Sequence, residues 1–287
     1  MTATEGFAPA KVNLCLHLTG LRDDGYHLLE SLVVFADVGD RLTATLADEL
    51  SLTVDGPFAN GVPVDGANLV LKAARLLRRL RGVDTGAALH LTKHLPHGGG
   101  IGGGSSDAAC AIRLLARLWE VAPLTTEEAL PLGADIPVCL CAPRATEMRG
   151  IGEVLAPARF QPGGWLVLVN PGVAVPTGRV FALYDRLYQF SAPGMADLGS
   201  VRDHDQFQAW LAGQRNDLTK VARETALAPV IGRVLDALQA YTATADMSGS
   251  GSTCWALFAD EQAARRCAEQ VGQMNPDWWV VPARILP

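Results

Sequence analysis

The residues whose chemistry is most evident lie in a glycine-rich run at residues 96–107. The run reads Pro-His-Gly-Gly-Gly-Ile-Gly-Gly-Gly-Ser-Ser-Asp, with glycine at six of the seven positions from 98 to 104. Because glycine has no Cβ, such a backbone can approach a ligand closely and point several N–H groups at it. The apolar spacing that follows predicts a helix over 105–119, whose N-terminus adds further N–H donors and a positive dipole end. The run therefore predicts a phosphate-binding loop.

A Walker A loop is excluded for this run, and a dinucleotide-binding loop or a flexible hinge fits it less well than a phosphate-binding loop. The run lacks the lysine of a Walker A loop. Gly98, Gly100 and Gly103 match the dinucleotide pattern Gly-x-Gly-x-x-Gly, but no strand–helix–strand unit opens the chain there, and the match means little in so glycine-dense a run. A flexible hinge remains open, although a hinge needs no helix that begins with Ser-Ser-Asp.

Two charged residues stand in otherwise apolar sequence. Asp135 follows Gly-Ala and precedes Ile-Pro, so it is either a cap or turn residue or a general base that takes a proton from a hydroxyl. Lys11 lies within an alternating strand pattern, in a chain with only four lysines among 24 basic residues. That placement indicates either a strand-end lysine or a site that needs a compact ammonium. Asn13, two residues on, shares its face.

Composition limits the class of protein. The 287 residues are 49% hydrophobic and 19% charged, which is enough apolar material for a core. The net charge of −6 argues against a nucleic-acid or anionic-membrane partner held by charge. The apolar stretches fall far short of the roughly 18–20 residues that span a bilayer, and the first residues show no secretory signal. The six scattered cysteines predict free thiols, and with them a cytoplasmic protein.

The elements that must position these residues mix strands and helices without a regular alternation, which predicts an α+β fold. Strands are expected over 7–19, 31–46, 89–95, 165–170 and 278–285, and the 248–252 turn is expected between strands. Helices are expected over 69–80, 105–119, 204–213, 217–223, 228–241 and 261–272. Glycines and prolines cluster at 150–164, which predicts two domains, residues 1–155 and 156–287.

Taken together, these blocks resemble the GHMP kinase superfamily, which includes galactokinase, homoserine kinase and mevalonate kinase. The run at 96–106 is similar to the family's ATP loop. The other matching blocks are similar in type and order: Pro9-Ala10-Lys11-Val12-Asn13-Leu14, Gly25-Tyr26-His27, Gly133-Ala134-Asp135-Ile136-Pro137 and Ser248-Gly249-Ser250-Gly251. The resemblance extends from about residue 7 to residue 285. It implies a two-domain GHMP kinase fold with an active-site cleft between the domains.

The resemblance also implies a reaction and a set of residues. ATP, with Mg²⁺, would phosphorylate the 2-hydroxyl of a cytidine-diphosphate-linked C-methylerythritol in non-mevalonate isoprenoid synthesis. Asp135 would be the base and Lys11 its cationic partner. The ATP-binding residues would be Pro96, His97, Gly98, Gly99, Gly100, Ile101, Gly102, Gly103, Gly104, Ser105 and Ser106. Ser106 is the one metal-binding candidate, by analogy, and we assign no other metal ligand.

On the substrate side, the resemblance implies that Tyr26 and Phe181 stack on the two faces of cytosine and that His27 contacts the base edge. Asn13 would contact the alcohol, and Thr177 would be a polar contact of the substrate. Asn68 and Leu69 resemble residues near the adenine, although Asn68 is equally well explained as a helix cap.

Other functions remain open at this point. One alternative is another small-alcohol kinase of the homoserine or mevalonate type. The substrates of such kinases carry no nucleobase that could stack on Tyr26 and Phe181. A non-catalytic nucleotide-binding protein would not need Lys11 and Asp135, and a dinucleotide oxidoreductase would respond to NAD(P)H. The chain departs from the family pattern in a short segment between Trp119 and Gly133. It also departs in Pro131, in His94 and His97, and in serine rather than threonine at 248 and 250.

Overall fold

The computed structural model describes residues 4–190, 193–224 and 227–287, and the chain divides into two compact units. The first unit comprises Met1–Ala10, Val38–His97 and Gly102–Ala142. The second comprises Lys11–Asp37, Gly98–Ile101 and Pro143–Pro287. Both units are discontinuous along the chain, a pattern that a search for glycine- and proline-rich linkers cannot find. The division into residues 1–155 and 156–287 stays a prediction.

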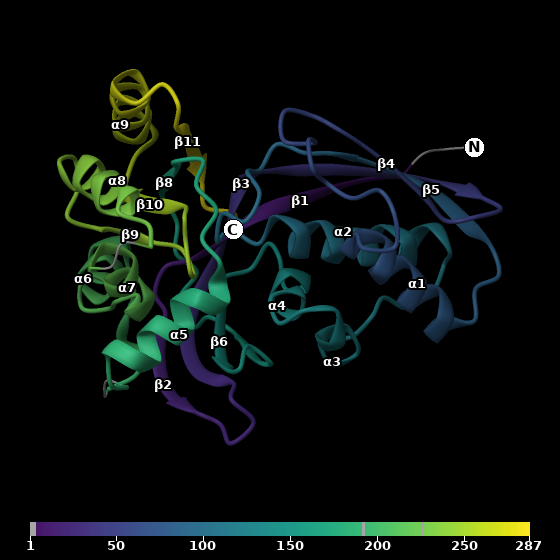
Figure 1. The fold of residues 1–287 in the computed structure, drawn as a ribbon, viewed down its shortest axis with the longest axis horizontal. Helices are drawn as coiled ribbons and strands as arrows, with labels where there is room; N and C mark the ends of the chain where they lie inside the picture. Colours follow the sequence, from purple (N-terminus) through teal and green to yellow (C-terminus); the bar gives the residue numbers. More distant parts are fainter. Residues whose placement is uncertain (1–3, 191–192, 225–226) are drawn as a thin grey trace. The chain divides into compact units, whose positions relative to one another are not determined.

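The first unit packs two helices against a small sheet. Strand β5 (Gly86–Thr92) pairs in parallel with β4 (Ser51–Asp55) and antiparallel with residues 41–47 of the long strand β3 (His27–Ala47). Helices α1 (Leu69–Arg81) and α2 (Gly103–Leu118) lie side by side on one face of these strands (Figure 1). Their apolar faces form one buried cluster with the strands, including Leu77, Leu89, Leu91, Ile112 and Leu115.

Helix α1 shows why the sequence folds as it does locally. The side chain of Asn68 accepts a hydrogen bond from the Val70 N–H at 2.8 Å and so caps the N-terminus. Gly82 ends the helix in the left-handed region, with φ of 63°. The predicted helix over 69–80, with this cap and this stop, is confirmed.

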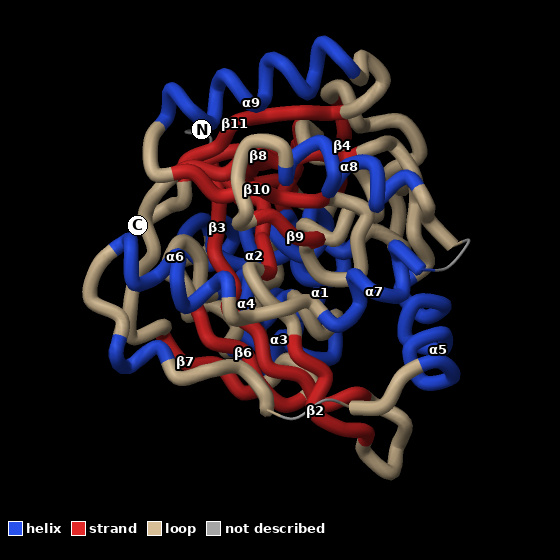
Figure 2. The backbone as a smooth tube through the Cα atoms, turned by 90° about the vertical axis from the view of Figure 1, so that its left-hand side faces the viewer, coloured by secondary structure: helices blue, strands red, loops and turns tan. Residues whose placement is uncertain are grey.

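The second unit contains an antiparallel sheet in the order β11, β8, β10, β9. These strands are β8 (Trp165–Asn170), β9 (Ala245–Met247), β10 (Cys254–Phe258) and β11 (Trp279–Arg284). Helices α8 (Val230–Gln239) and α9 (Glu261–Met274) pack beside it, and α9 runs along β11 in Figure 2. The buried cluster of this unit includes Val167, Val169, Ile231, Leu235 and Val271.

The second unit also contains the first half of β3, the strands that pair with it, and three further helices. Residues 27–33 of β3 pair antiparallel with β2 (His17–Leu21) and with β6 (Thr146–Gly150), and β6 pairs with β7 (Val154–Pro157). The remaining helices are α5 (Thr177–Leu187), α6 (His204–Ala212) and α7 (Asp217–Glu224), with a 3-10 turn at Leu198–Ser200.

The predicted α+β class is confirmed, with corrections to individual elements. The strand expected over 7–19 is two strands, β1 (Thr4–Asn13) and β2, because the chain leaves the sheet between them. Four elements and two short helices were not predicted: β4, β6, β7, α5, α3 (Thr126–Ala129) and α4 (Ile136–Leu140). Pro131 lies in a 3-10 turn, Leu130–Leu132, where it needs no helical N–H.

Two sequence predictions about the whole chain can be compared with the structure. All six cysteines are free thiols, as predicted. Among the described helices, none combines the length and apolar character needed to cross a bilayer.

Candidate active site

The glycine run changes from loop to helix at Gly102. Gly102 is the N-cap of α2 and lies in the left-handed region, with φ of 63°. It has no side chain with which to cap the helix, so the N–H groups of the first turn remain available to an anion. The N–H of Ser106 is the first to bond within the helix, to the Gly102 carbonyl at 2.7 Å. This is the geometry that the sequence predicts for a phosphate site.

The first half of the loop is fixed by close backbone contacts within the second unit. Gly100 has φ of 72°, and a Cβ there would lie 2.3 Å from the carbonyl oxygen of Ser248. The Thr253 N–H donates to the Gly99 carbonyl at 2.9 Å, and the Lys11 N–H donates to the Ile101 carbonyl at 3.0 Å. Only glycine fits at position 100, which explains why this part of the run carries no side chain.

Ser248 connects three motifs of the second unit. Its hydroxyl donates to the Gly100 carbonyl at 2.9 Å and accepts from the Asn13 N–H at 3.0 Å. The hydroxyl thus joins the end of β1, the glycine loop and the turn that follows β9. Serine supplies both contacts, so its presence in place of threonine leaves this connection intact.

Lys11 and Asn13 lie together on β1, as their spacing predicts. The Nζ atom of Lys11 donates to Oδ1 of Asn13 at 2.8 Å, and both residues are buried. The amide of Asn13 in turn donates to the Ser31 hydroxyl at 2.8 Å, and that hydroxyl donates to the Cys15 carbonyl at 2.6 Å. Because Asn13 is a neutral amide, its contact orients the ammonium without adding a charge of its own.

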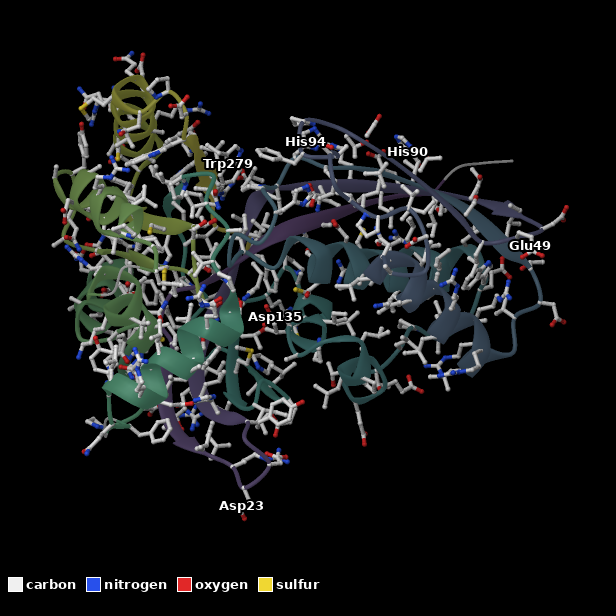
Figure 3. All side chains as sticks on the ribbon, in the orientation of Figure 1. Asp23, Glu49, His90, His94, Asp135 and Trp279 are labelled. Atoms are coloured by element: carbon white, nitrogen blue, oxygen red, sulfur yellow. The ribbon has the colours of Figure 1, made fainter. Side chains whose placement is uncertain are left out.

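Asp135 occupies the N-cap position of α4, with Pro137 in the first turn of the helix (Figure 3). It is half-buried, and its side chain does not cap its own helix. A simple capping role therefore does not account for it. Asp135 belongs to the first unit and Lys11 to the second, and their joint action stays a prediction.

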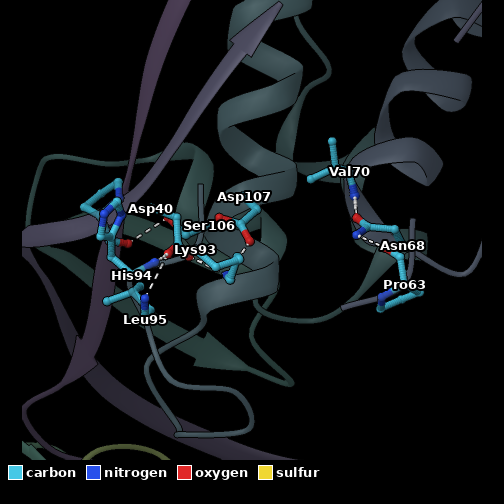
Figure 4. A network of polar contacts seen from close by, with 10 residues as sticks. Asp40, Pro63, Asn68, Val70, Lys93, His94, Leu95, Ser106 and Asp107 are labelled. Carbon is cyan, nitrogen blue, oxygen red and sulfur yellow. Dashed lines mark hydrogen bonds and ion pairs between the residues drawn. The ribbon is translucent and has the colours of Figure 1, made fainter. Parts of the chain in front are cut away.

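A buried ion cluster flanks the loop within the first unit (Figure 4). Lys93 pairs with Asp40 and, at 2.7 Å, with Asp107, which lies in the first turns of α2. Asp40 also accepts the backbone N–H groups of His94 and, at 2.9 Å, Leu95. The cluster therefore connects the segment that precedes the glycine loop to helix α2, which follows the loop.

Burial determines the charge state of this cluster. It raises the pKa of Asp107 to about 8, with the Asp40 charge adding to the shift and Lys93 opposing it. Burial alone would lower the pKa of Lys93, but the two carboxyl groups outweigh it and raise that pKa. Sequence reasoning missed Asp40, Lys93 and Asp107. The available signal was a rare lysine just before the glycine run and an aspartate just after it.

The hydroxyl of Ser106 donates to the Pro9 carbonyl at 2.7 Å, and the side chain is fully buried. A role of Ser106 at a metal ion stays a prediction. Within residues 4–190, 193–224 and 227–287, no three or more His, Cys, Asp or Glu side chains gather as a metal site would require.

The three residues expected at the nucleobase, Tyr26, His27 and Phe181, all belong to the second unit. His27 and Phe181 are in contact, whereas the ring of Tyr26 makes no contact with another aromatic ring among the described residues. The ring of His27, at the start of β3, lies 4.6 Å from the ring of Phe181 on α5. Its Nε2 atom lies 2.6 Å from Oδ1 of Asp185, a residue that sequence reasoning missed. Tyr26 is 58% exposed, in the hairpin that Asp23 marks in Figure 3. A flat ligand would therefore find an exposed aromatic face there.

Thr177 begins α5, and its hydroxyl lies 2.8 Å from the Ser250 hydroxyl. The contact joins α5 to the turn after β9, next to Ser248. Asn68 lies in the first unit, where it acts as the cap of α1.

Comparison with known proteins gives a consistent result. The model of the GHMP kinase N-terminal domain matches residues 68–143, and that of the GHMP kinase C-terminal domain matches residues 195–277. A 4-diphosphocytidyl-2-C-methyl-D-erythritol kinase of Cereibacter sphaeroides is 53% identical over 286 residues, covering 99% of each chain. One of Paramagnetospirillum magneticum is 51% identical over 294 residues, covering 100% of both.

Solved structures of GHMP kinases also resemble this chain over nearly its whole length. A crystal structure of 4-(cytidine 5′-diphospho)-2C-methyl-D-erythritol kinase superposes with a TM-score of 0.80 at 32% identity, covering 99% of each chain. A homoserine kinase from Cytophaga hutchinsonii superposes with a TM-score of 0.71 at 17% identity, covering 99% of this chain and 95% of its own. At that identity the second match shows the fold alone.

Proposed function

The chain belongs to the GHMP kinase family, and we propose that it transfers the γ-phosphoryl group of ATP to the 2-hydroxyl of 4-diphosphocytidyl-2-C-methyl-D-erythritol. The observation that carries the proposal is the 53% identity, over 99% of both chains, to a relative of that name. The phosphate loop and the aromatic ring pair of His27 and Phe181 support it from the geometry.

We propose that the triphosphate is held by backbone. The N–H groups at the start of α2 and the left-handed glycines 98, 100 and 102 suit an anion that must come within hydrogen-bond distance of main chain. Phosphoryl transfer depends on positioning and charge neutralisation, and a rigid loop supplies the first. The remaining residues of the loop, from Pro96 to Ser106, are proposed to complete the ATP-binding site and to hold these glycines in position.

Asp135 is proposed as the base that accepts the proton of the attacking hydroxyl. Lys11 is proposed to stabilise the ionised carboxylate and the negative charge that develops on the alcohol oxygen. The contact with Asn13 supports this role, because it fixes the position of the ammonium. Asn13 is proposed as a contact of the alcohol, and Thr177 as a polar contact of the substrate.

ATP is the co-substrate of this kinase family, and we propose that it binds as its magnesium complex. Phosphate oxygens are ordinary ligands of Mg²⁺ at nucleotide sites, so the triphosphate itself would supply ligands to the ion. A cytoplasmic location stays a prediction, and so does the absence of nucleic-acid and membrane partners.

Homoserine and mevalonate kinases remain the nearest alternatives within the family, since they share the fold. Their substrates carry no base that would use His27, Phe181 and Tyr26. A non-catalytic nucleotide-binding protein is disfavoured because Lys11 and Asp135 are both present.

The test is an assay of ADP release with a panel of alcohols. We expect release with the cytidyl-linked methylerythritol, and much less with free 2-C-methylerythritol, homoserine or mevalonate. Mass spectrometry of the product should show one added phosphate. Equal turnover of free 2-C-methylerythritol would contradict the proposed substrate, and ATP binding without any ADP release would favour the non-catalytic alternative.

A further inference from the structure

Asp185 makes a contact that the proposed reaction does not account for. Its Oδ1 atom lies 2.6 Å from Nε2 of His27, and the side chains are 40% and 12% exposed. Phe181 lies four residues earlier on α5, so it shares a helix face with Asp185. One helix face thus presents both a ring and a carboxylate to the same imidazole.

The contact determines which nitrogen of His27 carries the proton. An ionised carboxylate only accepts hydrogen bonds, so Nε2 must be the donor. In a neutral imidazole the other nitrogen, Nδ1, is then an acceptor. Among the described residues none makes a hydrogen bond with Nδ1, and this atom is not among the buried polar atoms that lack a partner. Nδ1 is therefore available to a ligand as an acceptor.

This arrangement distinguishes two pyrimidines. Cytosine carries an exocyclic amino group, a donor, at the position where uracil carries a carbonyl, an acceptor. An acceptor fixed at Nδ1 pairs with the first and opposes the second. A site that holds a polar group for one partner penalises the analogue that leaves it unpaired.

We propose that Asp185 is a positioning residue that sets the tautomer of His27, so that Nδ1 accepts from the cytosine amino group and disfavours uracil. The inference rests on the proposed function, in which His27 contacts the base edge. Asp185 acts through His27 and touches no reacting atom.

The test compares wild-type protein with Asp185→Ala and Asp185→Asn. Binding of the cytidyl-linked and uridyl-linked substrates is measured by calorimetry at pH 8, with a non-hydrolysable ATP analogue present, and turnover is measured separately. Asp236→Asn is the matched control, because Asp236 is another exposed helical carboxylate in an ion pair, with Arg223 at 2.8 Å. The control should behave as wild type.

We expect Asp185→Ala to reduce the preference for the cytidyl substrate at pH 8 by about tenfold, through Kd and KM rather than kcat. The Asn variant, which retains an acceptor oxygen but can also donate, should lie between Ala and wild type.

An unchanged preference in Asp185→Ala overturns the proposal. Selective cytidyl binding without turnover would support the role of Asp185 and contradict the proposed reaction. Turnover of both substrates at equal rates, with equal binding, would contradict the tautomer argument and leave the kinase activity standing.

Discussion

Oδ2 of Asp107 lies 2.7 Å from Nζ of Lys93, while Oδ1 of Asp107 is buried and has no hydrogen-bond partner among the described residues. An ionised oxygen in that position would cost more free energy than a protonated one, because an unpaired charge is harder to bury than an unpaired neutral group. Asp40, by contrast, receives two backbone N–H groups in addition to Lys93. The two aspartates of the cluster therefore differ in the hydrogen-bond donors that their oxygens receive.

The first prediction follows from this difference. Since the pKa of Asp107 is raised to about 8, the folded state holds a proton that the unfolded state releases above about pH 4. Its contribution to stability is therefore present below pH 4 and is lost as the pH rises through 8. Asp107→Asn mimics the protonated form, so its free energy of unfolding should decline less than that of wild type between pH 4 and pH 8.

Asp40→Asn is the paired variant. It leaves Lys93 buried without its ionised partner, which should cost about 3–5 kcal/mol at pH 7. Urea unfolding at a series of pH values measures both variants. Equal destabilisation by the two variants at pH 7 would show that the charge is shared rather than held by Asp40.

The second prediction concerns the chemical step. Asp135→Asn and Lys11→Ala should each lower kcat by about 10²-fold or more, the scale of positioned acid–base groups, while ATP still binds. Calorimetric ATP binding and steady-state turnover separate the two effects. Near-normal kcat in either variant would remove that residue from the mechanism. Lys220→Ala serves as the control, since Lys220 is a lysine on α7 outside the motifs.

The third prediction uses two glycines with the same backbone conformation. Gly102 at the start of α2 and Gly82 at the end of α1 both have φ of 63°. Alanine at either position should cost about 1–2 kcal/mol of stability, because the left-handed conformation crowds a Cβ. Only Gly102→Ala should also weaken ATP binding, since only Gly102 borders the N–H groups proposed to hold phosphate. Equal ATP affinity in both variants would place the triphosphate elsewhere.

The sequence predicted those parts of the fold and site that depend on neighbouring residues. Helix α1 could be predicted with its cap and its stop, because Asn68 and Gly82 act on adjacent backbone. The contact of Lys11 with Asn13 follows from the period of a strand. In the Asp40–Lys93–Asp107 cluster, Lys93 and Asp107 stand on either side of the glycine run, but Asp40 lies 53 residues before Lys93, so the local pattern does not reveal that the three side chains meet. Helix α5 was not predicted, and Asp185, which lies on it, was missed with it.

The fourth prediction concerns His17 in β2. Its two ring nitrogens are buried and make no hydrogen bond with the described residues. Burial, with the nearby charge of Arg215, lowers the pKa of this imidazole below 6.5, although Asp217 and Glu30 oppose the shift. The unfolded chain therefore takes up a proton that the folded state resists, and stability should fall as the pH drops below 6.5.

His17→Leu should lessen that fall, by at most about 1.4 kcal/mol per pH unit for the one proton involved. Thermal unfolding between pH 5 and pH 8 measures it. His90→Leu is the control, because His90 lies on β5 with an exposed side chain. If wild type and His17→Leu lose stability in parallel below pH 6.5, other groups govern the acid response.

The last prediction concerns the exposed aromatic face at Tyr26. Because Tyr26 is 58% exposed, Tyr26→Ala should leave stability nearly unchanged. Stacking of an aromatic side chain on a base contributes about 1–3 kcal/mol, so the KM for the cytidyl-linked substrate should rise roughly 5- to 100-fold while ATP affinity stays the same. Tyr241→Ala, which removes another exposed tyrosine at the end of α8, is the control. A loss of ATP affinity with an unchanged KM for the cytidyl-linked substrate would place Tyr26 at the adenine instead, because stacking tolerates either base. In that case the specificity for cytosine would depend on the edge contact of His27 alone.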